Sequence, residues 1–123
     1  MKTTKKQFQE FKEECEKWIE FFGLKDWEVV IKHRKIEDGY YALFEGGSYA
    51  SRMTMISLNI EIDDCAITKK DFFKKTAFHE VIHLLLCNLS TQGRARIFDD
   101  EEYEKSEHEI VQRLINSVYK ELK

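Results

Sequence analysis

The chain has 123 residues, a length that fits one domain with a hydrophobic core of its own. Its formal net charge of −3 argues against a general electrostatic affinity for nucleic acid. Hydrophobic residues make up 42% of the chain, but no run approaches the roughly 18 apolar residues of a membrane span. The N-terminus has no apolar signal core, so export is not expected. We therefore expect one cytoplasmic domain over residues 1–123, without membrane or specific nucleic-acid partners.

The cysteines support the same compartment. Cys15, Cys65 and Cys87 are odd in number, widely spaced and form no Cys-x-x-Cys pair. This usage favours reduced thiols in an intracellular protein over a disulfide framework.

The first part of the chain predicts a helix followed by two short strands. Apolar residues recur at three- and four-residue steps over residues 4–22, at Phe8, Phe11, Cys15, Trp18 and Phe22. This spacing indicates an amphipathic helix that ends at a glycine. Residues 26–32 are rich in β-branched and aromatic side chains and predict a strand. Asp38-Gly39 is a strong turn signal, so we expect a hairpin into a second strand over Tyr40–Phe44.

A second turn is expected at Gly46-Gly47, followed by the longest predicted strand, Ser48–Ile60. Apolar residues alternate with more polar ones along this strand, so one of its faces should meet the core. A strand with a polar face can bind an extended peptide by edge pairing. We expect the three strands to form a small, mostly antiparallel sheet.

The second half of the chain predicts two helices. Thr68-x-x-Asp71 resembles a capping box and predicts a helix over about residues 69–89, apolar nearly all round and therefore central. A loop over 90–98 and a closing helix from the acidic run at 99–102 should follow. The apolar stripe expected to face the core is Tyr103, Ile110, Val111, Leu114, Ile115 and Val118. The fold class predicted by this order of elements is α+β.

The central helix contains the segment His79-Glu80-Val81-Ile82-His83. Residues four apart on a helix lie on one face, so the two imidazoles can bind one metal ion at about 2.0–2.1 Å. Polar groups on a buried helix are costly unless they are satisfied, and a metal ion would satisfy these. The pattern His-Glu-x-x-His is typical of zinc metalloproteases, in which the glutamate is the general base.

A catalytic zinc site usually has three protein ligands and one open position, so a third ligand is needed. The closing helix is the expected source. If its apolar stripe faces inward, Glu107 faces the same way, whereas Glu109 faces outward. Glu107 is therefore the first candidate, with His108 and then Glu104 as alternatives. Cys87 continues the row of ligands along the central helix, but a buried thiol is the simpler interpretation.

These residues predict a zinc-dependent metallopeptidase that hydrolyses a peptide or protein substrate. Zn²⁺ on His79, His83 and Glu107 would lower the pKa of a bound water toward about 7. Glu80 would take that proton and pass it to the leaving amine. Three side chains are candidate donors to the oxyanion that develops: Tyr103, Tyr49 and Arg94.

A different interpretation is a metal-binding regulatory or interaction module that keeps the site without cleaving anything. Glu80 argues against it, because a purely structural metal site needs no general base. A closed fourth coordination position would argue for it.

With these residues identified, the chain resembles the small zincin-like metallopeptidases of phages and mobile elements, in their gluzincin-like branch. The resemblance implies a minimal zincin-like domain with His79 and His83 as ligands, Glu80 as base and an acid ligand at Glu107. Relatives often have two consecutive acids where this chain has Glu107-His108. A looser similarity links the chain to the SprT-like group, whose Cys-x-x-Cys zinc ribbon is absent here. The segments that carry the resemblance are Leu24–Val29, an edge strand such as Ala50–Asn59, His79–Leu85 and Glu107 ahead of Ile110-Val111.

Overall fold

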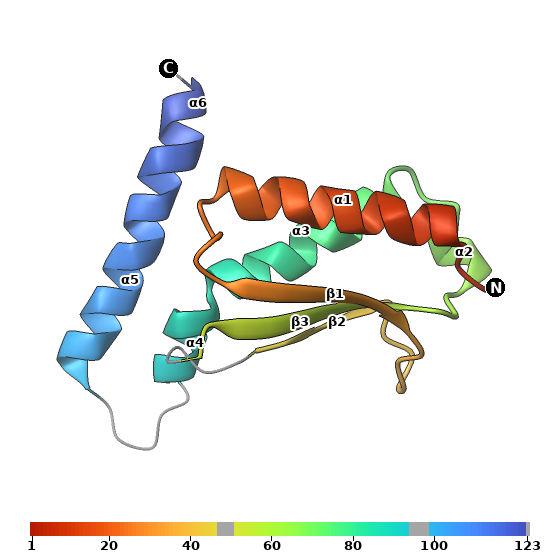
Figure 1. Ribbon diagram of the computed structural model, residues 1–123, viewed down its shortest axis with the longest axis horizontal. Coiled ribbons are helices and arrows are strands. Elements are labelled where there is room, and N and C mark those ends of the chain that lie inside the picture. Colours follow the sequence, from red (N-terminus) through yellow and green to blue (C-terminus); the bar gives the residue numbers. More distant parts are fainter. Residues whose placement is uncertain (47–50, 94–98, 123) are drawn as a thin grey trace.

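Two helices cover one face of a small sheet in the computed structural model, which describes residues 1–46, 51–93 and 99–122 (Figure 1). The combination confirms the α+β class. None of the helices within these ranges is long and apolar enough to cross a membrane. In chain order the elements are α1 (Lys5–Phe21), β1 (Glu28–Arg34), β2 (Ala42–Glu45), β3 (Met53–Asn59), α2 (Asp64–Ile67), α3 (Phe72–Leu85), α4 (Cys87–Gly93), α5 (Asp100–Leu114), the π-helical turn η1 (Ile115–Tyr119) and α6 (Lys120–Leu122).

Helix α1 begins and ends close to the predicted positions. The Thr4 hydroxyl accepts a hydrogen bond from the Gln7 backbone N–H at 3.1 Å, and the Gln7 side chain accepts one from the Thr4 N–H at 2.8 Å. This reciprocal pair is a capping box. Gly23, with φ +68°, ends the helix in the left-handed conformation that glycine adopts without strain. Phe11 and Cys15 are fully buried, where α1 packs on α3.

The sheet is mixed rather than mostly antiparallel, because β3 lies between β1 and β2. β3 pairs with β1 in parallel and with β2 antiparallel. The prediction of a hairpin at Asp38-Gly39 is therefore wrong, because β1 and β2 do not pair with each other. Both residues have positive φ and do form a turn. The prediction of an edge strand at Ala50–Asn59 is also wrong, because β3 (Met53–Asn59) is the central strand of the sheet. Among the described strands, β2 and β1 form the edges.

The side chain of Asn59 explains why the chain does not fold straight back after β1. It accepts hydrogen bonds from the backbone N–H groups of Ile36 at 3.2 Å and Glu61 at 3.1 Å. It donates to the carbonyl groups of Ile36 at 3.0 Å and Tyr40 at 2.7 Å. The loop after β1 is thus fastened to the end of β3, and it carries the chain to the far side of β3, where β2 pairs.

The single helix predicted over residues 69–89 is two helices in the structure, because α3 ends at Leu85 and α4 begins at Cys87. Thr68 donates its hydroxyl to the Cys65 carbonyl at 2.8 Å and so closes α2, a short helix that was not predicted. Asp71 has φ +56° and makes no side-chain cap hydrogen bond, so the predicted capping box is wrong. Residues 90–93, predicted as the start of a loop, belong to α4. Gly47 of the second predicted turn and residues 94–98 of the loop lie outside the described residues.

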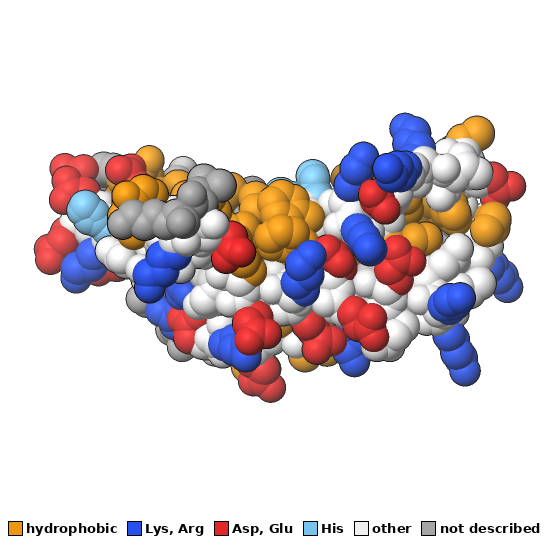
Figure 2. All heavy atoms as spheres, turned by 90° about the horizontal axis from the view of Figure 1, so that it is seen from above, with side chains coloured by type: hydrophobic (Ala, Val, Ile, Leu, Met, Phe, Trp, Pro, Cys, Tyr) orange, Lys and Arg blue, Asp and Glu red, His pale blue; other side chains and the backbone are white. Residues whose placement is uncertain are grey.

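Helix α3 is central, as predicted. Ala77, Val81 and Leu84 are at most 1% exposed, and they meet α1 on one side and the sheet on the other. Ile56 and Leu58 of β3 are fully buried beneath the two helices. Seen from above, charged side chains are scattered over the face, and an apolar area lies near its middle, with further apolar side chains toward the ends (Figure 2).

Helix α5 packs through a different face from the predicted one. Ser106 and Ile110 are buried, whereas Val111 is 48% and Leu114 is 38% exposed. Arg113 lies on the packed side, where it donates to the Gly23 carbonyl and to the carboxylate of Asp26. Of the apolar stripe that was predicted to face the core, only Ile110 is buried. The prediction is otherwise wrong, because polar contacts determine which face of α5 is packed.

Candidate metal centre

Helix α3 presents the imidazoles of His79 and His83 on adjacent turns. Their Nε2 atoms lie 3.1 Å apart, and their ring centroids are 4.9 Å apart. Two nitrogens bound to one tetrahedral zinc ion at about 2.0–2.1 Å are separated by about 3.3 Å. The two rings therefore converge at a spacing close to what one shared metal ion requires.

Glu80 lies between these imidazoles in sequence and is buried, with 6% of its surface exposed. Its Oε2 atom has no hydrogen-bond partner among the described residues. Burial raises the pKa of this carboxyl, and the nearby His79 partly offsets the rise. A buried polar atom without a partner costs about 1–3 kcal/mol, so its retention calls for a compensating role. A metal ion with its water beside the two imidazoles would provide the missing partner, and imidazole nitrogen is one of the ligands that zinc takes.

The imidazoles open into a cavity of about 650 Å³ between α3, β2 and α4. Phe44 of β2 stacks on His83, with 6.1 Å between the ring centroids. Cys87 lines the far end of this cavity and is 6% exposed, in agreement with the interpretation of a buried thiol. The site is thus a groove with a helix on one side and an edge strand on the other.

The structure does not bring the predicted third ligand to the imidazoles. Within residues 1–46, 51–93 and 99–122, no three His, Cys, Asp or Glu side chains are close enough to hold a metal ion. Glu107, His108 and Glu104 are all exposed on α5. Glu109, predicted to face outward, is instead half-buried and accepts hydrogen bonds from Asn88. Residues 47–50 and 94–98 contain none of these four residue types.

Two aromatic residues of the site were not predicted from the sequence. Tyr40 and Phe44 line the groove, and Tyr40 is 57% exposed at its mouth. The sequence indicated a strand here, but it gave no sign that this strand would be the one facing α3. Of the predicted oxyanion donors, Tyr49 and Arg94 lie outside the described residues, and Tyr103 is half-buried on α5.

No protein-family model matches the chain, and no curated protein or solved structure matches it.

Proposed function

We propose that this protein is a zinc-dependent metallopeptidase with a minimal zincin-like domain built around α3. The observation that carries the proposal is the arrangement of His79, Glu80 and His83. Two imidazole nitrogens converge at 3.1 Å beside a buried carboxylate oxygen that has no partner in the described chain. A purely structural site would need the imidazoles but not the adjacent carboxylate, which favours a hydrolase over a non-catalytic metal-binding module.

Zinc bound by His79 and His83 would supply a Lewis acid and lower the pKa of water toward about 7. Glu80 would accept the proton at Oε2 and later transfer it to the leaving amine. Because burial raises the pKa of Glu80, this carboxyl holds a proton more readily than an exposed glutamate does. The carboxylate is therefore suited both to take a proton and to return one.

The walls of the groove support a peptide substrate. Among the described strands β2 pairs only with β3, so backbone N–H and C=O groups along its other edge have no strand partner in the described chain. An extended peptide can add to such an edge as a further strand. In that position its backbone would run past the imidazoles of α3.

The third ligand in this proposal is Glu107 of α5. Glu107 shares a face of α5 with the exposed Val111 and Leu114, which lie four and seven residues further on. A placement of α5 that turned this face toward α3 would bury both aliphatic side chains and bring the carboxylate to the site. His108 and Glu104 are the alternatives on the same helix.

The test is a peptide-library digest with the zinc-loaded wild type, the Glu80→Gln variant and the Glu10→Gln variant as a surface control. Metal analysis should give about one zinc per chain in all three proteins. We expect cleavage by the wild type and the control, and a loss of at least about 10²-fold in Glu80→Gln. Full activity in Glu80→Gln would exclude Glu80 as the base. One bound zinc without any cleavage by the wild type would favour the metal-binding module.

A further inference from the structure

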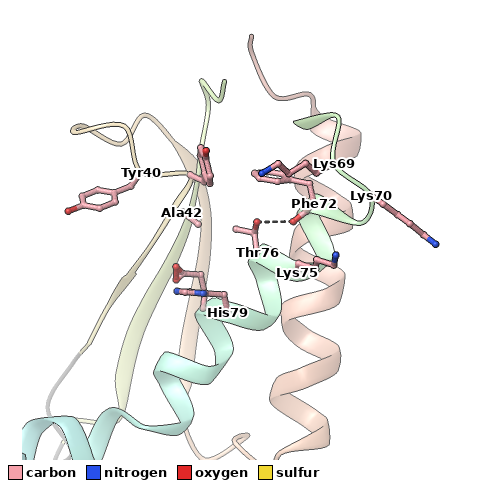
Figure 3. A pocket seen from close by; sticks show the side chains of 10 residues that line it. Tyr40, Ala42, Lys69, Lys70, Phe72, Lys75, Thr76 and His79 are labelled. Carbon is pink, nitrogen blue, oxygen red and sulfur yellow. Dashed lines mark hydrogen bonds between the residues drawn. The ribbon is translucent and has the colours of Figure 1, made fainter. Parts of the chain in front are cut away.

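A second cavity, of about 420 Å³, opens from Glu80 toward the N-terminal end of α3 (Figure 3). It shares Tyr40, Ala42, His79 and Glu80 with the groove that holds both imidazoles. The two cavities therefore meet at the proposed catalytic residues. A side chain next to the scissile bond of a bound peptide would enter this second cavity.

The second cavity is basic, although the chain as a whole is acidic. Lys69, Lys70 and Lys75 line it, and the buried Glu80 is its only acidic lining residue in the described chain. Lys17, Lys25 and Lys105 form ion pairs elsewhere, but these three lysines have no carboxylate partner among the described residues. The first turn of α3 also contributes to the wall, and the N-terminal end of a helix carries partial positive charge.

Lys69 is the best placed of the three lysines. In Figure 3 its side chain extends over the cavity toward the strands, whereas Lys70 points away. Figure 2 shows Lys and Arg side chains near the end of the molecule that carries α2, with Asp and Glu side chains between them. An anion in the cavity would therefore meet the ammonium group of Lys69 directly.

Aromatic rings form another part of the cavity wall. Tyr41 and Phe72 make an edge-to-face contact with 5.3 Å between their ring centroids. Tyr41 is 43% exposed, so its ring offers apolar area that the described chain leaves uncovered, whereas the ring of Tyr40 points away from the cavity (Figure 3). Such a wall can cover the methylene groups of a side chain whose charged end reaches the lysines.

We propose that this cavity is a subsite for an acidic side chain of the peptide substrate, next to the scissile bond, with Lys69 as the principal contact. The proposal rests on the peptidase function proposed above, and it adds that the preferred substrates are acidic. A lysine or arginine at the same substrate position would be repelled.

Binding to the zinc-loaded Glu80→Gln protein tests the subsite without hydrolysis. The probes are short fluorescent peptides that alternate Ala with Glu, Gln or Lys, and the readout is fluorescence anisotropy at low salt. We expect the Glu peptide to bind at least about fivefold more tightly than the Gln peptide. Adding Lys69→Gln should remove most of this preference, and Lys69→Glu should shift it toward the Lys peptide.

Lys74→Gln is the matched control, since it removes the same charge five residues further along the chain, at a lysine of α3 that does not line the cavity. Equal binding of the Glu and Gln peptides, or equal losses in Lys69→Gln and Lys74→Gln, would overturn the subsite. Tighter Lys69-dependent binding of a short oligothymidylate would overturn its assignment to a peptide.

Hydrolysis separates the subsite from the peptidase proposal. Cleavage of Glu and Gln peptides by the wild type at equal rates would overturn the subsite and leave the peptidase function standing. Charge-selective binding with no cleavage by the zinc-loaded wild type would overturn the peptidase function and support an acidic-peptide site.

Discussion

Asn88 donates two hydrogen bonds, both 3.2 Å long, to the carboxylate of Glu109, and this contact fastens α5 to α4. Asn88 is buried, so the contact requires Glu109 to face inward. Glu107, two residues earlier, is then turned outward. The orientation of the closing helix thus follows from a polar contact that its apolar periodicity does not reveal.

This orientation predicts unequal effects of two neighbouring substitutions. Glu109→Ala should lower the free energy of unfolding by about 1–2 kcal/mol, because it leaves the buried amide of Asn88 without its acceptor. Glu107→Ala should change it by no more than about 0.5 kcal/mol, because an exposed side chain is removed. Urea unfolding of the metal-free proteins in EDTA measures both values. A larger loss in Glu107→Ala would contradict the observed packing of α5.

The imidazole of His33 predicts a loss of stability in mild acid. Its Nε2 lies 2.6 Å from the Thr3 hydroxyl, and its ring stacks on Phe8 with 4.9 Å between centroids. Burial lowers the pKa of this histidine in the folded protein, so the unfolded chain binds the proton more readily. The stabilising contribution is present above the ordinary histidine pKa of about 6.5 and is lost as pH falls toward the lower folded value.

Urea unfolding between neutral pH and about pH 5 tests this, since that range spans the histidine pKa. The free energy of unfolding should fall less steeply in His33→Gln than in the wild type. His108→Gln, at an exposed position of α5, should retain the wild-type slope. Identical slopes in all three proteins would rule out His33 as the source.

The three cysteines should differ in reactivity. Cys65 is exposed, whereas Cys15 and Cys87 are 0% and 6% exposed, and burial raises the pKa of the Cys15 thiol. Only an accessible thiolate reacts quickly with an aromatic disulfide reagent. The native protein should therefore release about one fast equivalent per chain and three after unfolding. Cys65→Ser should remove the fast phase; two fast equivalents in the native wild type would show that a buried thiol is accessible.

Features encoded within one helix were predictable from the sequence. The periodicity of α1, the central position of α3 and the shared face of His79 and His83 depend only on residues a few positions apart. The sheet order was not predictable, because it depends on hydrogen bonds from Asn59 to a loop about twenty residues earlier. The buried face of α5 likewise depends on Arg113 reaching Asp26, 87 residues away.

The third ligand is the part of the proposed site that most needs a measurement. If Glu107 binds zinc, Glu107→Gln should weaken zinc affinity by at least about tenfold, which corresponds to about 1.4 kcal/mol. Glu101→Gln, an exposed change on the same helix, should leave the affinity unchanged. Competition with a chromogenic zinc chelator gives both values. An unchanged zinc affinity in Glu107→Gln would exclude Glu107 as a ligand. The same measurement on His108→Gln and Glu104→Gln would then test the two alternatives.

The most direct measurement of the central claim is the anomalous difference map of a zinc-soaked crystal, recorded at the zinc absorption edge. We expect one strong peak within about 2.1 Å of Nε2 of both His79 and His83. We also expect a position for a water between that peak and the Glu80 carboxylate. Well-ordered imidazoles without a peak between them, or a peak that touches neither ring, would contradict a zinc ion shared by His79 and His83.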